Sequence, residues 1–114
     1  MIIHILRERA TAEQVAEMLQ ELHSYIKIAV DIERGIVAGG GEMHYDCEQV
    51  LITDGSRQED IWGANWYPTE KRVEFEALIN IRPRQGNRTM LIQDPTLRMQ
   101  IEKTTRAIFE GTEK

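Results

Sequence analysis

The sequence predicts an α+β fold, in which a single antiparallel sheet of four to six strands carries an N-terminal and a C-terminal helix on one face. Apolar and polar residues alternate through several neighbouring segments in the middle of the chain, a pattern typical of strands with one buried and one wet face. The segments near the two ends show helical spacing instead. Strands that follow one another through short turns form antiparallel hairpins, and we expect the helices to cover the resulting sheet.

The clearest alternation lies in residues 60–87. If Tyr67 stands opposite Arg72 across a turn at residues 68–71, then Trp66 faces Val73, and the next two pairs are Ala64–Phe75 and Trp62–Ala77. All these apolar residues then share one side of the sheet, which fixes the register. We expect this hairpin to form the centre of the core, with Trp62 or Trp66 largely buried. The second strand should continue through Ile79 and Ile81 and end at Pro83.

The first third of the chain predicts a strand, a helix and a hairpin. Residues 2–6 form a short apolar run. Thr11 and Gln14 have the spacing of a capping box, so a helix should begin there. Residues 26–32 and 36–38 alternate around a turn at Gly35, which is free to take positive φ. The three glycines at 39–41 indicate a bend, a bulge or a close backbone approach. The apolar stripe of the helix comprises Val15, Met18, Leu19, Leu22 and Ile26.

The later segments are less uniform. Residues 42–48 fit either a strand or a helix, and we favour an extended segment that continues through residues 49–53. Asp94 followed by Pro95 predicts the start of a last helix, because Asp caps free N–H groups and Pro is tolerated in the first turn. Gly111 should end that helix.

Length, charge and cysteine content restrict the class of protein. The 114 residues suggest a single domain over 1–114, and no secretory signal or membrane-spanning run is visible. The net charge of −5 argues against nucleic-acid binding, which needs a basic face. Cys47 is the only cysteine, so no internal disulfide can form. We therefore expect a cytoplasmic protein that binds no membrane.

Three strings in the sequence are also informative: VDIERGIVAGGG from Val30, DIWGANWYP from Asp60 and INIRPRQGNR from Ile79. Together they resemble a small prokaryotic domain family of unknown function, and the resemblance covers nearly the whole chain. It implies a stand-alone bacterial or archaeal cytoplasmic domain. It implies no activity and no active-site residue.

The strongest candidate site is an arginine-rich stretch after the central hairpin. Guanidinium groups suit carboxylate and phosphate, and amide side chains add neutral donors. The alternative is a solvated loop whose arginines pair with Glu74, Glu76 or Asp60. Arg82 is the best single candidate because it leaves the end of a strand. The candidate ligand-binding residues are Asn80, Arg82, Arg84, Asn87 and Arg88.

Residues 44–48 gather histidine, tyrosine, cysteine and two acids, but they indicate no clear catalytic site. His44 and Cys47 would share a face on a helix and would point to opposite faces on a strand. A lone cysteine with apolar neighbours is more often a small core residue. The histidines lack the paired spacing of a zinc site, so we expect no metal and no cofactor.

Three function classes are consistent with these observations, and one of them, a purely structural subunit, would show no cavity at all. The first is a binding or interaction module that recognises an anionic ligand through the arginine-rich stretch. It would have a homo-oligomeric or protein partner on the open face of the sheet. The alternative is a small hydrolase or ribonuclease-like enzyme that uses the same arginines with His44 or Glu74 as base. A cavity that joins His44 to Arg82 would favour the enzyme.

Overall fold

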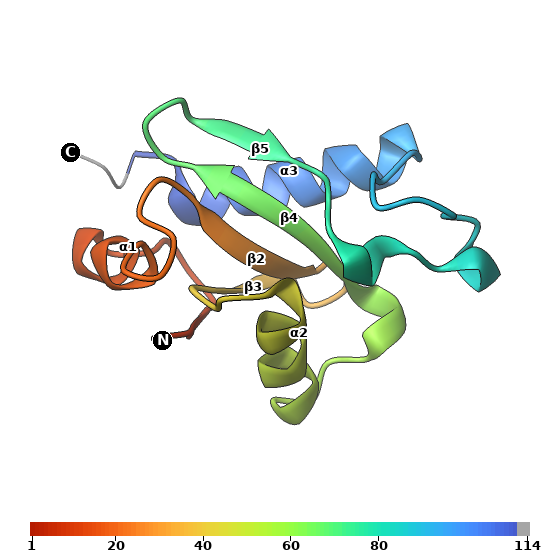
Figure 1. The fold of residues 1–114 in the computed structure, drawn as a ribbon, viewed down its shortest axis with the longest axis horizontal. Coiled ribbons are helices and arrows are strands. Elements are labelled where there is room, and N and C mark those ends of the chain that lie inside the picture. The colour runs from red at the N-terminus through yellow and green to blue at the C-terminus, as the bar shows by residue number, and fades with distance from the viewer. Residues whose placement is uncertain (112–114) are drawn as a thin grey trace.

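The protein folds into one antiparallel sheet with helices against both of its faces (Figure 1). The structure is a computed structural model and describes residues 1–111 of the 114-residue chain. Within that range, five strands lie in the order β1-β3-β2-β4-β5, and every neighbouring pair is antiparallel. The α+β class predicted from the sequence is therefore confirmed.

The strands are β1 (His4–Leu6), β2 (Ile26–Asp31), β3 (Ile36–Gly39), β4 (Ile61–Tyr67) and β5 (Arg72–Glu74). The α-helices are α1 (Ala12–Met18), α2 (His44–Thr53) and α3 (Pro95–Phe109), and the 3-10 helices are η1 (Gln58–Asp60), η2 (Leu78–Asn80) and η3 (Pro83–Gln85). Among the described helices, none is long and apolar enough to cross a membrane.

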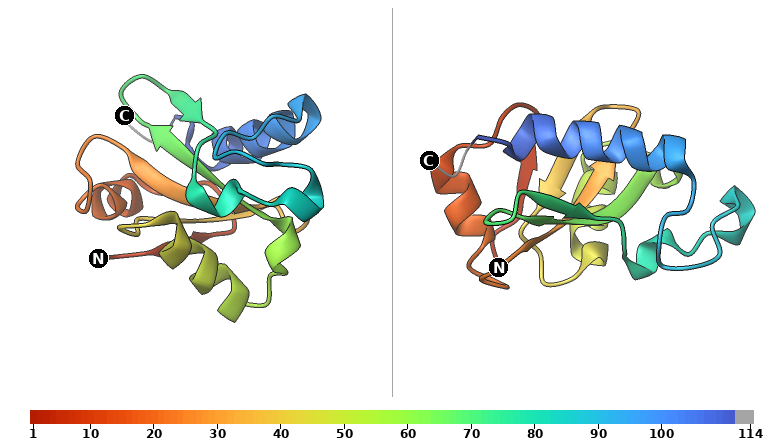
Figure 2. Two further views of the ribbon diagram at one scale, coloured as in Figure 1. Left: turned by 45° about the vertical axis from the view of Figure 1, so that its right-hand side comes forward. Right: turned by 90° about the horizontal axis from the view of Figure 1, so that it is seen from above.

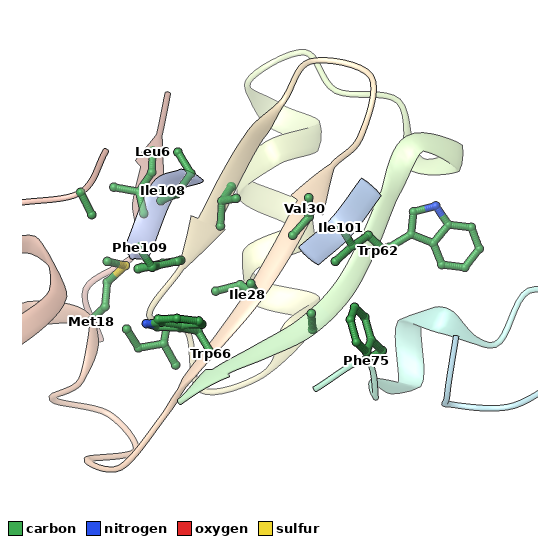
Figure 3. Close-up of a cluster of buried hydrophobic side chains, with 14 of the residues drawn as sticks. Leu6, Met18, Ile28, Val30, Trp62, Trp66, Phe75, Ile101, Ile108 and Phe109 are labelled. Carbon is green, nitrogen blue, oxygen red and sulfur yellow. The ribbon is translucent and has the colours of Figure 1, made fainter. Parts of the chain in front are cut away.

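The main core lies between the first face of the sheet and the two helices α1 and α3, and Figure 2 shows α3 running across that face. Trp66 and Phe109 stack with ring centroids 5.7 Å apart, and Met18 lies beside them (Figure 3). Both Trp62 and Trp66 are buried, as predicted. The expected packing of the N-terminal and C-terminal helices on one face is also confirmed.

The second face of the sheet is covered in part by α2, which corrects the prediction for residues 42–48. The extended reading was wrong, because these residues enter a helix that continues to Thr53. The Asp46 carboxylate accepts a hydrogen bond from the Met43 N–H at 3.0 Å and so caps the helix start. Cys47 and Leu51, one turn apart, then pack on the small side chains Ala29 and Ala38 of the sheet.

The part of the second face that lies beyond the N-terminus of α2 carries Lys27, Asn65, Tyr67 and Glu74. We call this part the polar half. Lys27 has the same parity as Ala29, and Asn65 and Tyr67 have the same parity as Ile61. Glu74 stands opposite Asn65. The wet face predicted from the alternation is therefore limited to this part of the sheet.

The central hairpin follows the predicted register only as far as Glu74. Trp66 pairs with Val73 and Tyr67 with Arg72, as expected, but β5 then ends and the chain turns through η2 and η3. The prediction of a strand reaching Pro83 was wrong. Asn80 explains the break: its side chain accepts from the Gly63 N–H at 2.8 Å and donates to the Gly63 carbonyl at 2.9 Å. One amide thus takes the place of a strand partner.

Most local signals elsewhere are confirmed. Thr11 and Gln14 form the expected capping box, and Asp94 caps α3 ahead of Pro95. Gly35 turns the β2–β3 hairpin with φ of 67°. A Cβ at Gly40 would collide with the Ile2 carbonyl oxygen, so this glycine marks a close backbone approach. The first helix is shorter than its apolar stripe suggested, because it ends at Met18 and Ile26 already belongs to β2.

Candidate functional site

A cavity of about 810 Å³ lies where α2 meets the segment that follows β5. It joins α2 to the arginine-rich stretch through Tyr45 and Glu48. His44, on the same helix, is not in its lining. Polar groups and the apolar side chains of residues 79, 81 and 83 share its wall. The lining residues are Tyr45, Glu48, Gln58, Glu59, Ile79, Ile81, Arg82, Pro83, Arg84 and Gln85.

Arg82 is held from several directions at the cavity. Its Nε donates to the Ile79 carbonyl at 2.9 Å, and its Nη1 donates to the Gln58 carbonyl at 2.7 Å. Its Nη2 donates to Glu48 Oε2 at 3.1 Å, and the guanidinium carbon lies 4.7 Å from the centre of the Trp62 ring. The side chain is 11% exposed. Arg82 thus connects the 79–85 segment to η1, α2 and β4.

Glu48 is the residue that the sequence analysis missed. Its side chain is only 3% exposed, and its ion-pair partner is Arg82. Burial raises the pKa of the Glu48 carboxyl, although Arg82 opposes the change, and burial likewise lowers the pKa of Arg82. Groups whose pKa values are shifted inside a cavity are candidates for a functional site. The signal was hidden because Glu48 faces the cavity only if residues 44–53 are helical.

The other predicted ligand-binding residues divide into two groups. Arg84 lines the cavity and is exposed. Arg88 is exposed as well but lies outside the cavity lining. Asn80 is fully buried against Gly63, and Asn87 is buried with its Nδ2 donating to the Asn80 carbonyl at 2.8 Å. These two amides hold the backbone that positions the arginines.

A second polar group occupies the polar half of the second face. His44 Nε2 lies 2.7 Å from Asn65 Oδ1 and 3.0 Å from the Ala64 carbonyl oxygen. Asn65 Nδ2 in turn reaches Glu74 Oε1 at 3.5 Å, and the Tyr67 hydroxyl donates to the same oxygen at 2.9 Å. His44 and Glu74 are therefore connected to each other, and neither lines the cavity.

The histidine and the cysteine of α2 are both in poorly reactive states. Burial lowers the pKa of His44, against the raising effect of its hydrogen bonds to Asn65 and Ala64. Both neighbours of Nε2 are acceptors, so this nitrogen carries the proton. Burial raises the pKa of the Cys47 thiol to about 12, which leaves almost no thiolate at neutral pH. Cys47 thus behaves as the small core residue that its pattern predicted.

The described residues contain no group of three or more His, Cys, Asp or Glu side chains that could hold a metal ion. The family model "Protein of unknown function (DUF5674)" matches residues 4–108. The chain belongs to this family. Membership confirms the resemblance to a small domain family of unknown function and assigns no activity to any residue of the cavity. The chain matches no curated protein and no solved structure.

Proposed function

We propose that the protein is a binding module whose cavity, between α2 and residues 79–85, takes a ligand with a phosphate or carboxylate group. One observation carries the proposal. Within residues 1–111, the Arg84 guanidinium has no hydrogen-bond or ion-pair partner although it stands at the cavity. The neighbouring cation, Arg82, is held in place by backbone carbonyls and Glu48. A fixed and an uncommitted guanidinium in the lining of one cavity suit an anionic group.

The other walls of the cavity support a ligand with an apolar body. Tyr45 and Ile81 are exposed at the cavity, and Pro83 adds a rigid apolar surface. Sites for small ligands combine such apolar walls with a few polar groups that orient the ligand. The anionic group would therefore bind at the arginines while carbon atoms contact Tyr45 and Ile81.

Binding alone fits the geometry better than hydrolysis. A hydrolase would need a base within hydrogen-bond reach of the group held by the arginines. The two bases proposed from the sequence, His44 and Glu74, lie in the polar half and are connected through Asn65. Neither base is therefore placed to act on a group bound at the arginines.

The test compares Arg84→Ala with Arg88→Ala, an exposed arginine of the same stretch outside the cavity. Thermal unfolding is followed in sulfate and in citrate at low and high sodium chloride. We expect both anions to stabilise wild type and Arg88→Ala, less so at high salt. Arg84→Ala should bind about 10- to 100-fold more weakly, since hydrogen bonds to charged groups contribute about 1.5–3 kcal/mol. Equal responses from all three proteins would contradict the proposal.

Two coarser proposals accompany the binding site. We propose a cytoplasmic location, supported by the single, buried Cys47. We also propose that the polar half of the second face meets a second copy of the chain or another protein, since Lys27, Tyr67 and Glu74 remain partly exposed there. Light scattering after size-exclusion chromatography would detect self-association, and a monomer at all concentrations would contradict the homo-oligomer.

A further inference from the structure

We propose that Glu48 takes up a proton when the cavity binds an anion, and that its carboxyl group then donates a hydrogen bond to the ligand. This inference rests on the proposed function, because it concerns the same cavity and the same anionic group. Glu48 is the buried acid of the cavity, and the binding proposal alone gives it no role.

Arg82 and Glu48 pair with each other and both line the cavity. The guanidinium has five N–H groups. Nε is occupied by the Ile79 carbonyl, and Nη1 by the Gln58 carbonyl at 2.7 Å and by Gln85 Oε1 at 3.4 Å. Nη2 donates to Glu48 and has one further N–H. An anion at Arg82 must therefore use the nitrogen that already serves Glu48.

Two negative groups would then share one end of a guanidinium. The Glu48 side chain is 3% exposed, so water cannot screen it from a bound anion. Close carboxylates in similar positions resolve the repulsion when one of them takes a proton. The proton comes from solvent, and the neutral carboxyl becomes a donor where it had been an acceptor. Burial already raises the pKa of Glu48, which is the same direction of change.

The charged and titratable groups around Glu48 do not remove this repulsion. Arg82 and Arg84 come from the 79–85 segment, and Glu59 comes from η1. Glu59 is exposed and pairs with Arg57 at 2.6 Å, so the two together add no net positive charge to the site. Other titratable groups lie on α2 itself, namely His44, Tyr45, Asp46 and Cys47, and Lys27 and Asp31 lie on the sheet face that carries α2.

The sign of the resulting pH dependence follows from linkage. A bound anion raises the pKa of Glu48 above its value in the free protein, so binding takes up a proton between those two values. Affinity is then greatest at low pH and falls as pH rises, by at most about tenfold per pH unit for one proton. The protein binds its ligand with its own carboxyl group neutral.

The experiment is calorimetric titration of the whole protein with sulfate, whose charge is constant between about pH 5 and pH 8. The titration is repeated at one pH in two buffers with different ionisation enthalpies, and the difference gives the number of protons taken up. We expect up to one proton per sulfate and weaker binding at higher pH. This measurement needs no variant, so it does not depend on the folding of a mutant.

Variants then assign the proton. Glu48→Gln should bind sulfate without proton uptake and with no pH dependence, because its amide donates at every pH. Glu59→Gln, the control at the second acid of the cavity, should keep the wild-type uptake. Sulfate binding that needs Arg84 but takes up no proton would overturn the inference and leave the binding module intact. No dependence on Arg84 at any pH would overturn both.

Discussion

Two arginine–glutamate pairs flank β4, and they differ in burial far more than in chemistry. Arg82 pairs with Glu48 at 3.1 Å with side chains 11% and 3% exposed, whereas Arg72 pairs with Glu74 at 2.7 Å with side chains 44% and 38% exposed. Each arginine also lies over an aromatic ring of β4, Trp62 in the first case and Tyr67 in the second.

The pKa shifts of the two pairs have opposite signs. In the exposed pair, the hydrogen bond between the partners lowers the pKa of Glu74 and raises that of Arg72. In the buried pair, loss of water raises the pKa of Glu48 and lowers that of Arg82. Burial therefore outweighs the ion pair at the cavity, even though the partners are in hydrogen-bond contact. The shorter distance belongs to the exposed pair, whose charged form the hydrogen bond favours.

The largest expected effect separates the two arginines. Arg82→Ala should lower the free energy of unfolding by about 3–5 kcal/mol, because it leaves the Glu48 charge buried without its partner. Arg72→Ala, the matched control, should unfold close to wild type, since water screens Glu74. Urea unfolding of both variants measures the difference. Similar losses for the two would show that burial does not distinguish the pairs.

The next effect is the pH dependence of stability, which has opposite signs for the two glutamates. The pKa of Glu48 is raised above its ordinary value of 4.5, so its contribution is complete below that pH and declines as pH rises through the folded-state value. The pKa of Glu74 is lowered, so its contribution is lost as pH falls below 4.5. Glu48→Gln should remove the decline above pH 4.5, at most about 1.4 kcal/mol per pH unit. An unchanged profile would contradict the raised pKa.

The smallest effect concerns salt. Raising sodium chloride should remove the slight difference between Arg72→Ala and wild type, because exposed charges are screened at high ionic strength. The defect of Arg82→Ala should persist in the same solutions. Parallel urea titrations at low and high salt provide the measurement. If salt rescues Arg82→Ala as well, the buried pair is accessible to ions.

The sequence predictions were correct where the signal depends on a few neighbouring residues and wrong where it depends on residues far apart in the chain. Helix caps such as Thr11 and Asp94, and the turn at Gly35, are determined within a few residues and were found where predicted. The helix α2 was missed because few of its side chains, chiefly Cys47 and Leu51, are buried in the core, and this face is specified by small side chains distant in sequence, such as Ala29. Tertiary packing decided for the helix, although the sequence analysis favoured the extended pattern.

The prediction of the candidate site was limited in the same way, by contacts between residues far apart in the chain. Arg82 was chosen as a candidate because its residue type and its position after the hairpin are visible in the sequence, and the structure places it in the cavity lining. Glu48 was missed because its place depends on α2. The amides of Asn80 and Asn87 were assigned to a ligand, whereas in the structure they bond to backbone atoms. A sequence shows which side chains can form hydrogen bonds, but the fold decides with which partners.

The amide of Asn80 also affects how the molecule meets its neighbours. The edge of a sheet is a template on which a second chain can add a strand and begin to aggregate. Beyond the short β5, the outward N–H and C=O groups of Gly63 are already taken by this one side chain. A foreign strand would have to displace a buried asparagine before it could pair there. A residue that bends the chain away from the sheet thus also protects that stretch of edge from intermolecular pairing.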